Sequence, residues 1–132
     1  HEGPPLTIAQ FRRIALALPG AVESSHMGHP DFRSGGRIFA SMQPDRGIAV
    51  VKLTPGQQAE AVAADPQIFV PQAGAWGRQG WTAVVLDQAD EERAGAALTL
   101  AWQNLDTARR SRSTRRPAGG DGSRTPRRVR RR

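Results

Sequence analysis

The sequence predicts one small α+β domain, an antiparallel sheet backed by helices on one side, followed by a disordered tail. The 132 residues leave room for a single hydrophobic core. Helical spacings of apolar residues are separated by runs with strand character, in the order α, β, β, β, α, β, β, α. Near residue 108 the apolar periodicity stops, and Arg, Ser, Thr, Pro and Gly take over. We therefore divide the chain into a leader (1–6), a domain (7–107) and a disordered Arg-rich tail (108–132).

The first helix is predicted to begin after Thr7 and to end before Pro19. The Thr7 hydroxyl is suited to cap the helix, and Gln10, three residues later, completes a capping box. Apolar residues then recur at helical spacing. The expected buried stripe is Ile8, Phe11, Ala15 and Leu18.

A strand meander is predicted to follow. Residues 31–42 form a hairpin bent at the paired glycines 35–36, and a turn at residues 44–47 leads into a β-branched strand, residues 47–53. The apolar run in this strand is typical of a central strand that is covered on both faces. The inward positions expected in the hairpin are Phe32, Ile38 and Ala40.

A short helix after Thr54 repeats the capping pattern, with Gln57 as the capping-box partner and Pro55 at the first helical position. Strands are expected at residues 68–70 and 81–86. The buried face expected for the helix is Ala59, Val62 and Ala63.

The last helix is predicted to be capped by Asp90, with Glu91 and Glu92 placed favourably in its first turn. Its inward positions are expected to be Ala94, Ala97, Leu98, Ala101 and Leu105. The first and the last helix of the domain should therefore both pack an apolar face against the sheet.

Composition excludes several classes of protein. The chain has no cysteine, which rules out disulfides, a thiolate nucleophile and a zinc–cysteine site, and we expect a cytoplasmic location. No apolar run approaches the roughly 20 residues needed to cross a bilayer, so we expect no membrane segment. The start of the chain does not combine a basic region with an apolar one, so we expect no secretory signal.

The net charge of +7 is divided unevenly along the chain. Residues 1–107 hold seven arginines and one lysine against eleven carboxylates, a net charge of −3, whereas residues 108–132 hold eleven arginines against one aspartate, a net charge of +10. We therefore expect nucleic-acid affinity to be driven by the tail and to be non-specific. The alternative is a tail with no selected role. The candidate tail contacts are Arg109, Arg110, Arg127 and Arg128.

Four short segments carry a resemblance to a known family. They are residues 74–82 (GAWGRQGWT), 18–23 (LPGAVE), the pair 30–33 and 36–40 (PDFR and GRIFA), and 101–102 (AW). In this order and at this spacing, the chain resembles the MmcQ/YjbR family over residues 7–107. The resemblance implies a frataxin-like (CyaY-like), double-wing-like fold in bacterial proteins described as DNA-binding, and it supplies no catalytic residue.

The segment 74–82 holds the candidate site. Trp76 and Trp81 are candidates for stacking on bases, with core packing as the alternative, and the strand position of Trp81 favours the core. Arg78 is either a phosphate contact or a solvated charge. The glycines do not fit a dinucleotide fingerprint and are expected at positive φ or at close backbone approaches. A basic stripe around Arg33, Arg37 and Arg78 would favour nucleic-acid binding, whereas dispersed charges beside an apolar groove would favour an interaction module.

No constellation of catalytic groups is visible, so we expect a non-enzymatic protein without cofactor. We do not predict a metal site at His26, His29 and Asp31. Their segment contains Gly and Pro rather than a helix, so a non-helical chain would have to bring all the ligands together. Lys52, in a strand, is either a buried amine of lowered pKa or an extended side chain with its amine in water. The alternative to DNA binding is a protein or small-ligand interaction module. The sequence does not indicate an oligomeric state.

Overall fold

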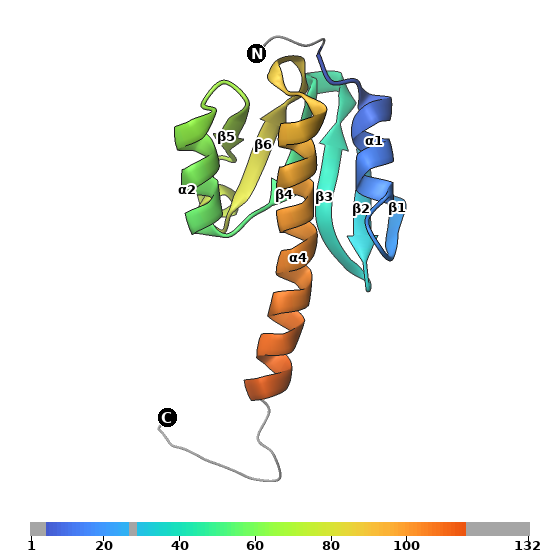
Figure 1. The fold of residues 1–132 in the computed structure, drawn as a ribbon, viewed down its shortest axis with the longest axis vertical. Coiled ribbons are helices and arrows are strands. Elements are labelled where there is room, and N and C mark those ends of the chain that lie inside the picture. Colours follow the sequence, from blue (N-terminus) through green and yellow to red (C-terminus); the bar gives the residue numbers. More distant parts are fainter. Residues whose placement is uncertain (1–4, 27–28, 116–132) are drawn as a thin grey trace.

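The computed structural model describes residues 5–26 and 29–115, which form a six-stranded antiparallel sheet and four α-helices (Figure 1). The strand order is β1-β2-β3-β4-β6-β5. The strands are β1 (Ala21–His26), β2 (His29–Ser34), β3 (Arg37–Gln43), β4 (Ile48–Lys52), β5 (Phe69–Pro71) and β6 (Trp81–Val85). The helices are α1 (Ile8–Leu16), α2 (Pro55–Ala64), α3 (Gly74–Arg78) and α4 (Glu91–Arg115), with short 3₁₀ turns η1 (Pro44–Arg46) and η2 (Leu86–Gln88).

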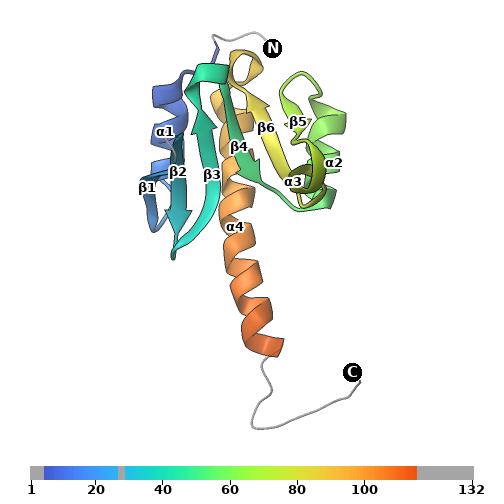
Figure 2. The ribbon, with the colours of Figure 1, turned by 180° about the vertical axis from the view of Figure 1, so that it is seen from behind.

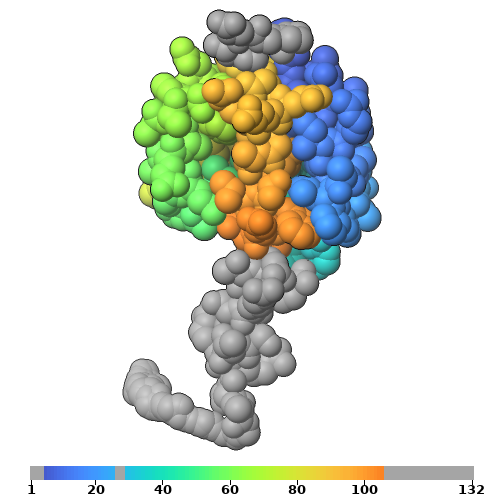
Figure 3. Space-filling model, viewed as in Figure 1, coloured from blue at the N-terminus to red at the C-terminus, as the bar shows by residue number. Residues whose placement is uncertain are grey.

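The three longer helices lie on one side of the sheet. Helix α4 packs against β3 and β4, α1 packs against α4 and β1, and α2 packs against β5. Figure 3 shows this helical face, with α4 running between α1 and α2. Seen from behind, the central strands have no helix over them, and only the short α3 lies beside β5 and β6 (Figure 2). The predicted α+β class, with helices backing one side of an antiparallel sheet, is confirmed.

The predicted helix starts are also confirmed. In α1 the Gln10 backbone N–H donates to the Thr7 hydroxyl at 3.1 Å, and the Thr7 N–H donates to the Gln10 side chain at 2.8 Å. Thr54 and Gln57 form the same reciprocal pair before α2, at 3.1 and 2.9 Å. Each pair satisfies backbone donors that the first turn of a helix leaves without partners.

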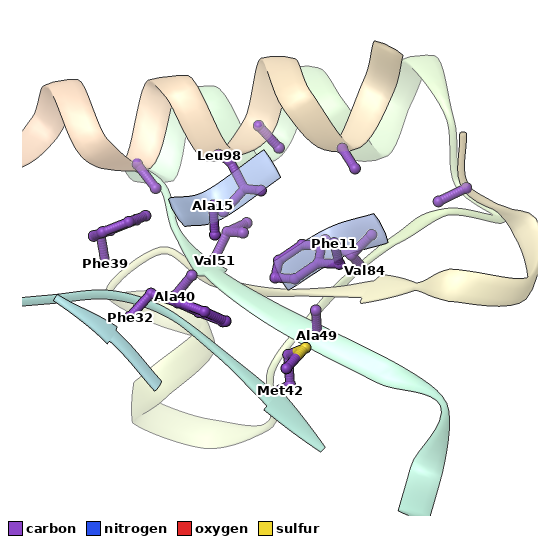
Figure 4. Close-up of a cluster of buried hydrophobic side chains, with 14 of the residues drawn as sticks. Phe11, Ala15, Phe32, Phe39, Ala40, Met42, Ala49, Val51, Val84 and Leu98 are labelled. Carbon is purple, nitrogen blue, oxygen red and sulfur yellow. The ribbon is translucent and has the colours of Figure 1, made fainter. Parts of the chain in front are cut away.

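The core lies between the sheet and the helices (Figure 4). Phe11 of α1 and Phe32 of β2 meet edge to face, with ring centroids 6.2 Å apart. Val51 of β4 and Leu98 of α4 are fully buried near them. All inward positions predicted for α4 are buried, namely Ala94, Ala97, Leu98, Ala101 and Leu105.

The hairpin departs from the predicted inward pattern at Ile38. Phe32 and Ala40 are buried as expected, but Ile38 is 36% exposed and Phe39 is buried in its place. Phe32 pairs with Ala40, and the next residue, Arg33, pairs with Ile38, so Phe39 is an extra residue in β3. Such a bulge reverses the alternation, which puts Ile38 on the opposite face of the sheet from Ala40.

The predicted buried face of α2 is also wrong in part. Ala59 and Ala63 are exposed, whereas Ala61 and Val62 pack against the core. The inward face of α2 also carries Gln58, whose side-chain amide donates to the Gly77 and Trp81 carbonyl oxygens at 3.0 and 3.2 Å. An inward-facing polar residue cannot be recognised from apolar spacing alone.

Several boundaries differ from those expected. The sequence predicts no strand for the residues of β1 and no helix for those of α3. Leu6, assigned to the leader, is buried and donates its N–H to the Leu86 carbonyl at 3.1 Å. Helix α4 continues to Arg115, past the expected boundary after residue 107, and the rest of the predicted disordered tail lies outside the described residues. Within the described part of the chain, no helix combines the length and apolar character needed to cross a membrane.

Candidate binding groove on the open face of the sheet

The face of the sheet away from the helices carries a shallow groove of about 370 Å³. Its floor follows one row of cross-strand neighbours, since Asp31 pairs with Ser41 and Ser41 pairs with Val50. Ile38, which the bulge turns outward, lines one wall, and two tryptophans line the other. The groove therefore combines an apolar wall with polar groups on its floor.

Trp76 and Trp81 form the aromatic wall. Their ring centroids are 6.1 Å apart and the rings meet at 73°, an edge-to-face pair. Trp76, on α3, is 64% exposed, so most of its ring faces water. Trp81, at the start of β6, is partly buried.

The core position expected for Trp81 is wrong. Trp81 pairs with Lys52 on the open face, and the next residue, Thr82, is the one that is fully buried, in register with Val51. Because side chains alternate along a strand, Trp81 and Thr82 must lie on opposite faces. Thr82 tolerates the core because its hydroxyl donates to the Gly80 carbonyl at 2.9 Å.

Glycines set the position of α3 and hence of Trp76. A Cβ on Gly77 would lie 1.8 Å from the Gln72 carbonyl oxygen, and a Cβ on Gly80 would lie 1.8 Å from that of Leu53. Gly80 also has φ of 109°, a conformation that side chains disfavour. The predicted close approaches and positive φ values in this segment are confirmed.

A basic pocket of about 430 Å³ adjoins the groove and shares Ile38 and Trp81 with it. Arg33, Arg37 and Lys52 line this pocket. The Lys52 Nζ lies 5.9 Å from the centre of the Trp81 ring, within the range of a cation–π contact. It also donates to the Gln79 carbonyl oxygen at 2.9 Å.

The pKa of Lys52 is lowered, first by burial and then by the nearby positive charge of Arg37. The shift has the direction expected of a buried amine, but Lys52 is only partly buried. Arg37 and Lys52 line the same pocket, which brings their positive charges near each other. An anion between them would relieve that repulsion.

Arg33 differs from the other two cations because it is paired. Its Nε and Nη2 donate to the two carboxylate oxygens of Asp31 at 2.9 and 3.3 Å. Asp31 is only 3% exposed, and its hydrogen bond raises the pKa of Arg33. Among the described residues, no carboxylate lies within 4 Å of the cationic atoms of Arg37 or Lys52, so those two are the more available for an anion.

The structure brings together four of the candidate site residues and leaves the rest apart. Those brought together at the groove and the basic pocket are Arg33, Arg37, Trp76 and Trp81. Arg78 is exposed at the end of α3 and lines neither hollow. Arg109 and Arg110 fall on α4 beyond the sheet, and Arg127 and Arg128 lie outside the described residues.

Two residues of this site were missed as site residues. Lys52 and Asp31 were considered separately, one as a strand lysine and one as a possible metal ligand. Pairing β4 with β6 antiparallel would have set Lys52 opposite Trp81, but the sequence does not give that register. Among the residues that the structure describes, no group of three or more His, Cys, Asp or Glu side chains is placed to hold a metal ion.

Comparisons with known proteins agree with this architecture. The model of the YjbR family matches residues 16–104. A crystal structure of the Deinococcus radiodurans protein DR2400, which carries the DUF419 domain, aligns with a TM-score of 0.68 and 20% identity, covering 93% of this chain and 100% of that one. No curated protein matches the sequence. At this identity the structural likeness speaks for the fold alone, whereas the family match covers most of the sheet and its helices, and the chain therefore belongs to the YjbR family.

Proposed function

We propose that the folded domain is a non-enzymatic module that binds nucleic acid across the open face of its sheet. One observation carries the proposal: an exposed tryptophan, Trp76, packs against Trp81 directly beside the cations Lys52 and Arg37. Bases stack on exposed aromatic rings, and phosphates bind to arginine and lysine. The site therefore offers partners for both halves of a nucleotide.

The acidic net charge of residues 1–107 does not oppose this proposal, because the charges are separated in space. Register places the end of β3 beside the start of β4 and the end of β6, so η1, η2 and the start of α4 lie at the end of the sheet away from Lys52. That end holds Asp45, Asp87, Asp90, Glu91 and Glu92, some of them paired with arginines. The basic pocket is thus kept away from these five carboxylates.

Helix α4 leaves the sheet at the end that carries the basic pocket. Asn104 and Leu105 of α4 line the basic pocket, and α4 then continues away from the sheet (Figure 1). The sequence of this extension includes Arg109 and Arg110. Non-specific affinity from the tail would therefore add to binding at the open face. The same proposal takes the protein to be bacterial and to act in the cytoplasm.

The test compares binding of labelled DNA by variants of the full chain. Trp76→Ala and Arg37→Ala should each weaken binding, by about 1 kcal/mol or more. The control is Arg13→Ala, which removes an exposed arginine from α1 on the helical face. If all three variants bind as the wild type does, the open face is not a nucleic-acid site.

The groove volume of about 370 Å³ also suits a small ligand, which favours the alternative of a small-molecule binding module. The same variants separate the two functions. A small-ligand module would lose binding of that ligand in Trp76→Ala while its affinity for DNA stays unchanged.

A further inference from the structure

We infer that the open face takes an unpaired strand rather than a duplex, with one base against Trp76 in the groove and a neighbouring phosphate in the basic pocket. The inference rests on the proposed nucleic-acid function and names the form of nucleic acid that fits this site. It follows from the two hollows and from the way they join.

The two hollows share two lining residues. Ile38 and Trp81 line both, so a ligand that fills the groove continues into the basic pocket without leaving the protein surface. The groove is bounded by indole rings, and the pocket by the cations Arg37 and Lys52. A nucleotide has the same arrangement, a flat apolar base joined through a sugar to an anionic phosphate.

The exposed ring distinguishes an unpaired base from a paired one. Trp76 is 64% exposed and is held edge to face against Trp81, so its surface is available to a flat partner. In a duplex the faces of the bases are covered by their neighbours, and only unstacked bases can lie on an aromatic side chain. The close backbone approaches at Gly77 and Gly80 determine where α3 places this ring.

The floor of the groove supplies groups for the edge of a base. Ser41 lies on this floor, and Gln72 also lines the groove. A glutamine amide offers two donors and an acceptor, and a serine hydroxyl can donate and accept. The Watson–Crick edge can use such groups only when it is not already paired. A duplex would also need cations on both sides of a broad surface, whereas Arg37 and Lys52 lie at one end of the groove.

The experiment uses the full chain and measures affinity for a labelled single-stranded oligonucleotide and for a duplex of the same length, at one salt concentration. The tail contributes to both affinities, so the informative quantity is the ratio of variant to wild type for each probe. Trp76→Ala should weaken single-strand binding by about 5- to 150-fold, the effect of losing one stacked base. Its duplex affinity should change by less than about twofold.

Two further variants serve as controls for Trp76→Ala. Trp76→Phe should recover most of the single-strand affinity, and Leu100→Ala, which trims an exposed apolar side chain on the helical face, should change neither affinity. Equal weakening of both probes by Trp76→Ala would overturn the inference and leave the proposed function standing. No weakening of either probe would overturn both.

Discussion

The position of the tryptophan wall depends on two close backbone approaches, and these give a quantitative prediction for Gly80→Ala. The new Cβ would lie 1.8 Å from the Leu53 carbonyl oxygen, where any contact below 3 Å forces a shift. Overpacking of this kind costs about 1–3 kcal/mol. The φ of 109° adds strain on the order of 1–2 kcal/mol, and loss of the 3.1 Å bond from Leu53 N–H to the Gly80 carbonyl adds about 1 kcal/mol.

We therefore expect Gly80→Ala to lower the free energy of unfolding by about 3–6 kcal/mol, measured by urea denaturation. In a domain of this size the Tm should fall by at least about 12 °C. Two further variants separate the causes. Gly74→Ala meets nothing within 4 Å and tests the strain at φ of 66° alone, whereas Gly77→Ala has no positive φ and tests the clash with Gln72 alone. If Gly80→Ala melts within a few degrees of Gly74→Ala, the close approach of β6 to the end of β4 is refuted.

Three other outcomes are expected. Since the pKa of Lys52 is lowered by burial and by Arg37, an NMR titration of this single lysine should give a pKa below 10.5, and that pKa should rise in Arg37→Ala. The wild-type free energy of unfolding should also increase with pH just below 10.5, an increase that Lys52→Met should lack. A Lys52 pKa that Arg37→Ala leaves unchanged would contradict this prediction. Truncation after Asp106 keeps every residue of α4 whose side chain is described as buried, and it should remove most non-specific affinity for nucleic acid. The full chain should lose about a thousandfold in affinity between 50 and 200 mM salt if roughly six arginines engage phosphates, whereas undiminished binding by the truncated chain would assign that affinity to the domain. EDTA should leave the Tm unchanged, because no metal is expected to hold the fold, and a large fall in Tm would reveal a metal site.

The elements that the sequence predicted correctly are those with local signals. Capping boxes at Thr7 and Thr54 depend on residues three positions apart, and the α4 stripe depends on spacing within one helix. Both kinds of signal depend only on residues that are near in sequence, not on how the strands pair. The α+β class followed from them because the strand runs between the helices are short and turn-bounded.

The errors share a non-local cause. Ile38 faces outward because of a bulge at Phe39, and a bulge depends on pairing with β2 rather than on the residues of β3 alone. Trp81 faces outward because Thr82 is buried. The segment WTAVV alone does not determine which of the two faces the core, because that depends on the strands that pair with β6. A strand can place its residues on either face with equal local propensity, and the sheet decides.

The candidate site was predicted in its residue types but not in its assembly. Both tryptophans and two arginines of the site were recognised from the sequence, whereas their meeting with Lys52 and Asp31 required the register of β2, β3, β4 and β6. Arg78, which sits among the glycines in sequence, lines neither hollow in space.

The most direct test of the open face as the binding surface uses the three tryptophans as reporters. Trp76 and Trp81 line the groove, whereas the indole Nε1–H of Trp102 on α4 donates to the Pro19 carbonyl at 2.8 Å, away from the groove. In an NMR titration of the full chain with a short single-stranded oligonucleotide, the indole N–H signals of Trp76 and Trp81 should shift and that of Trp102 should stay in place. A shift of the Trp102 signal alone, or of none of the three at saturating oligonucleotide, would contradict binding at the open face.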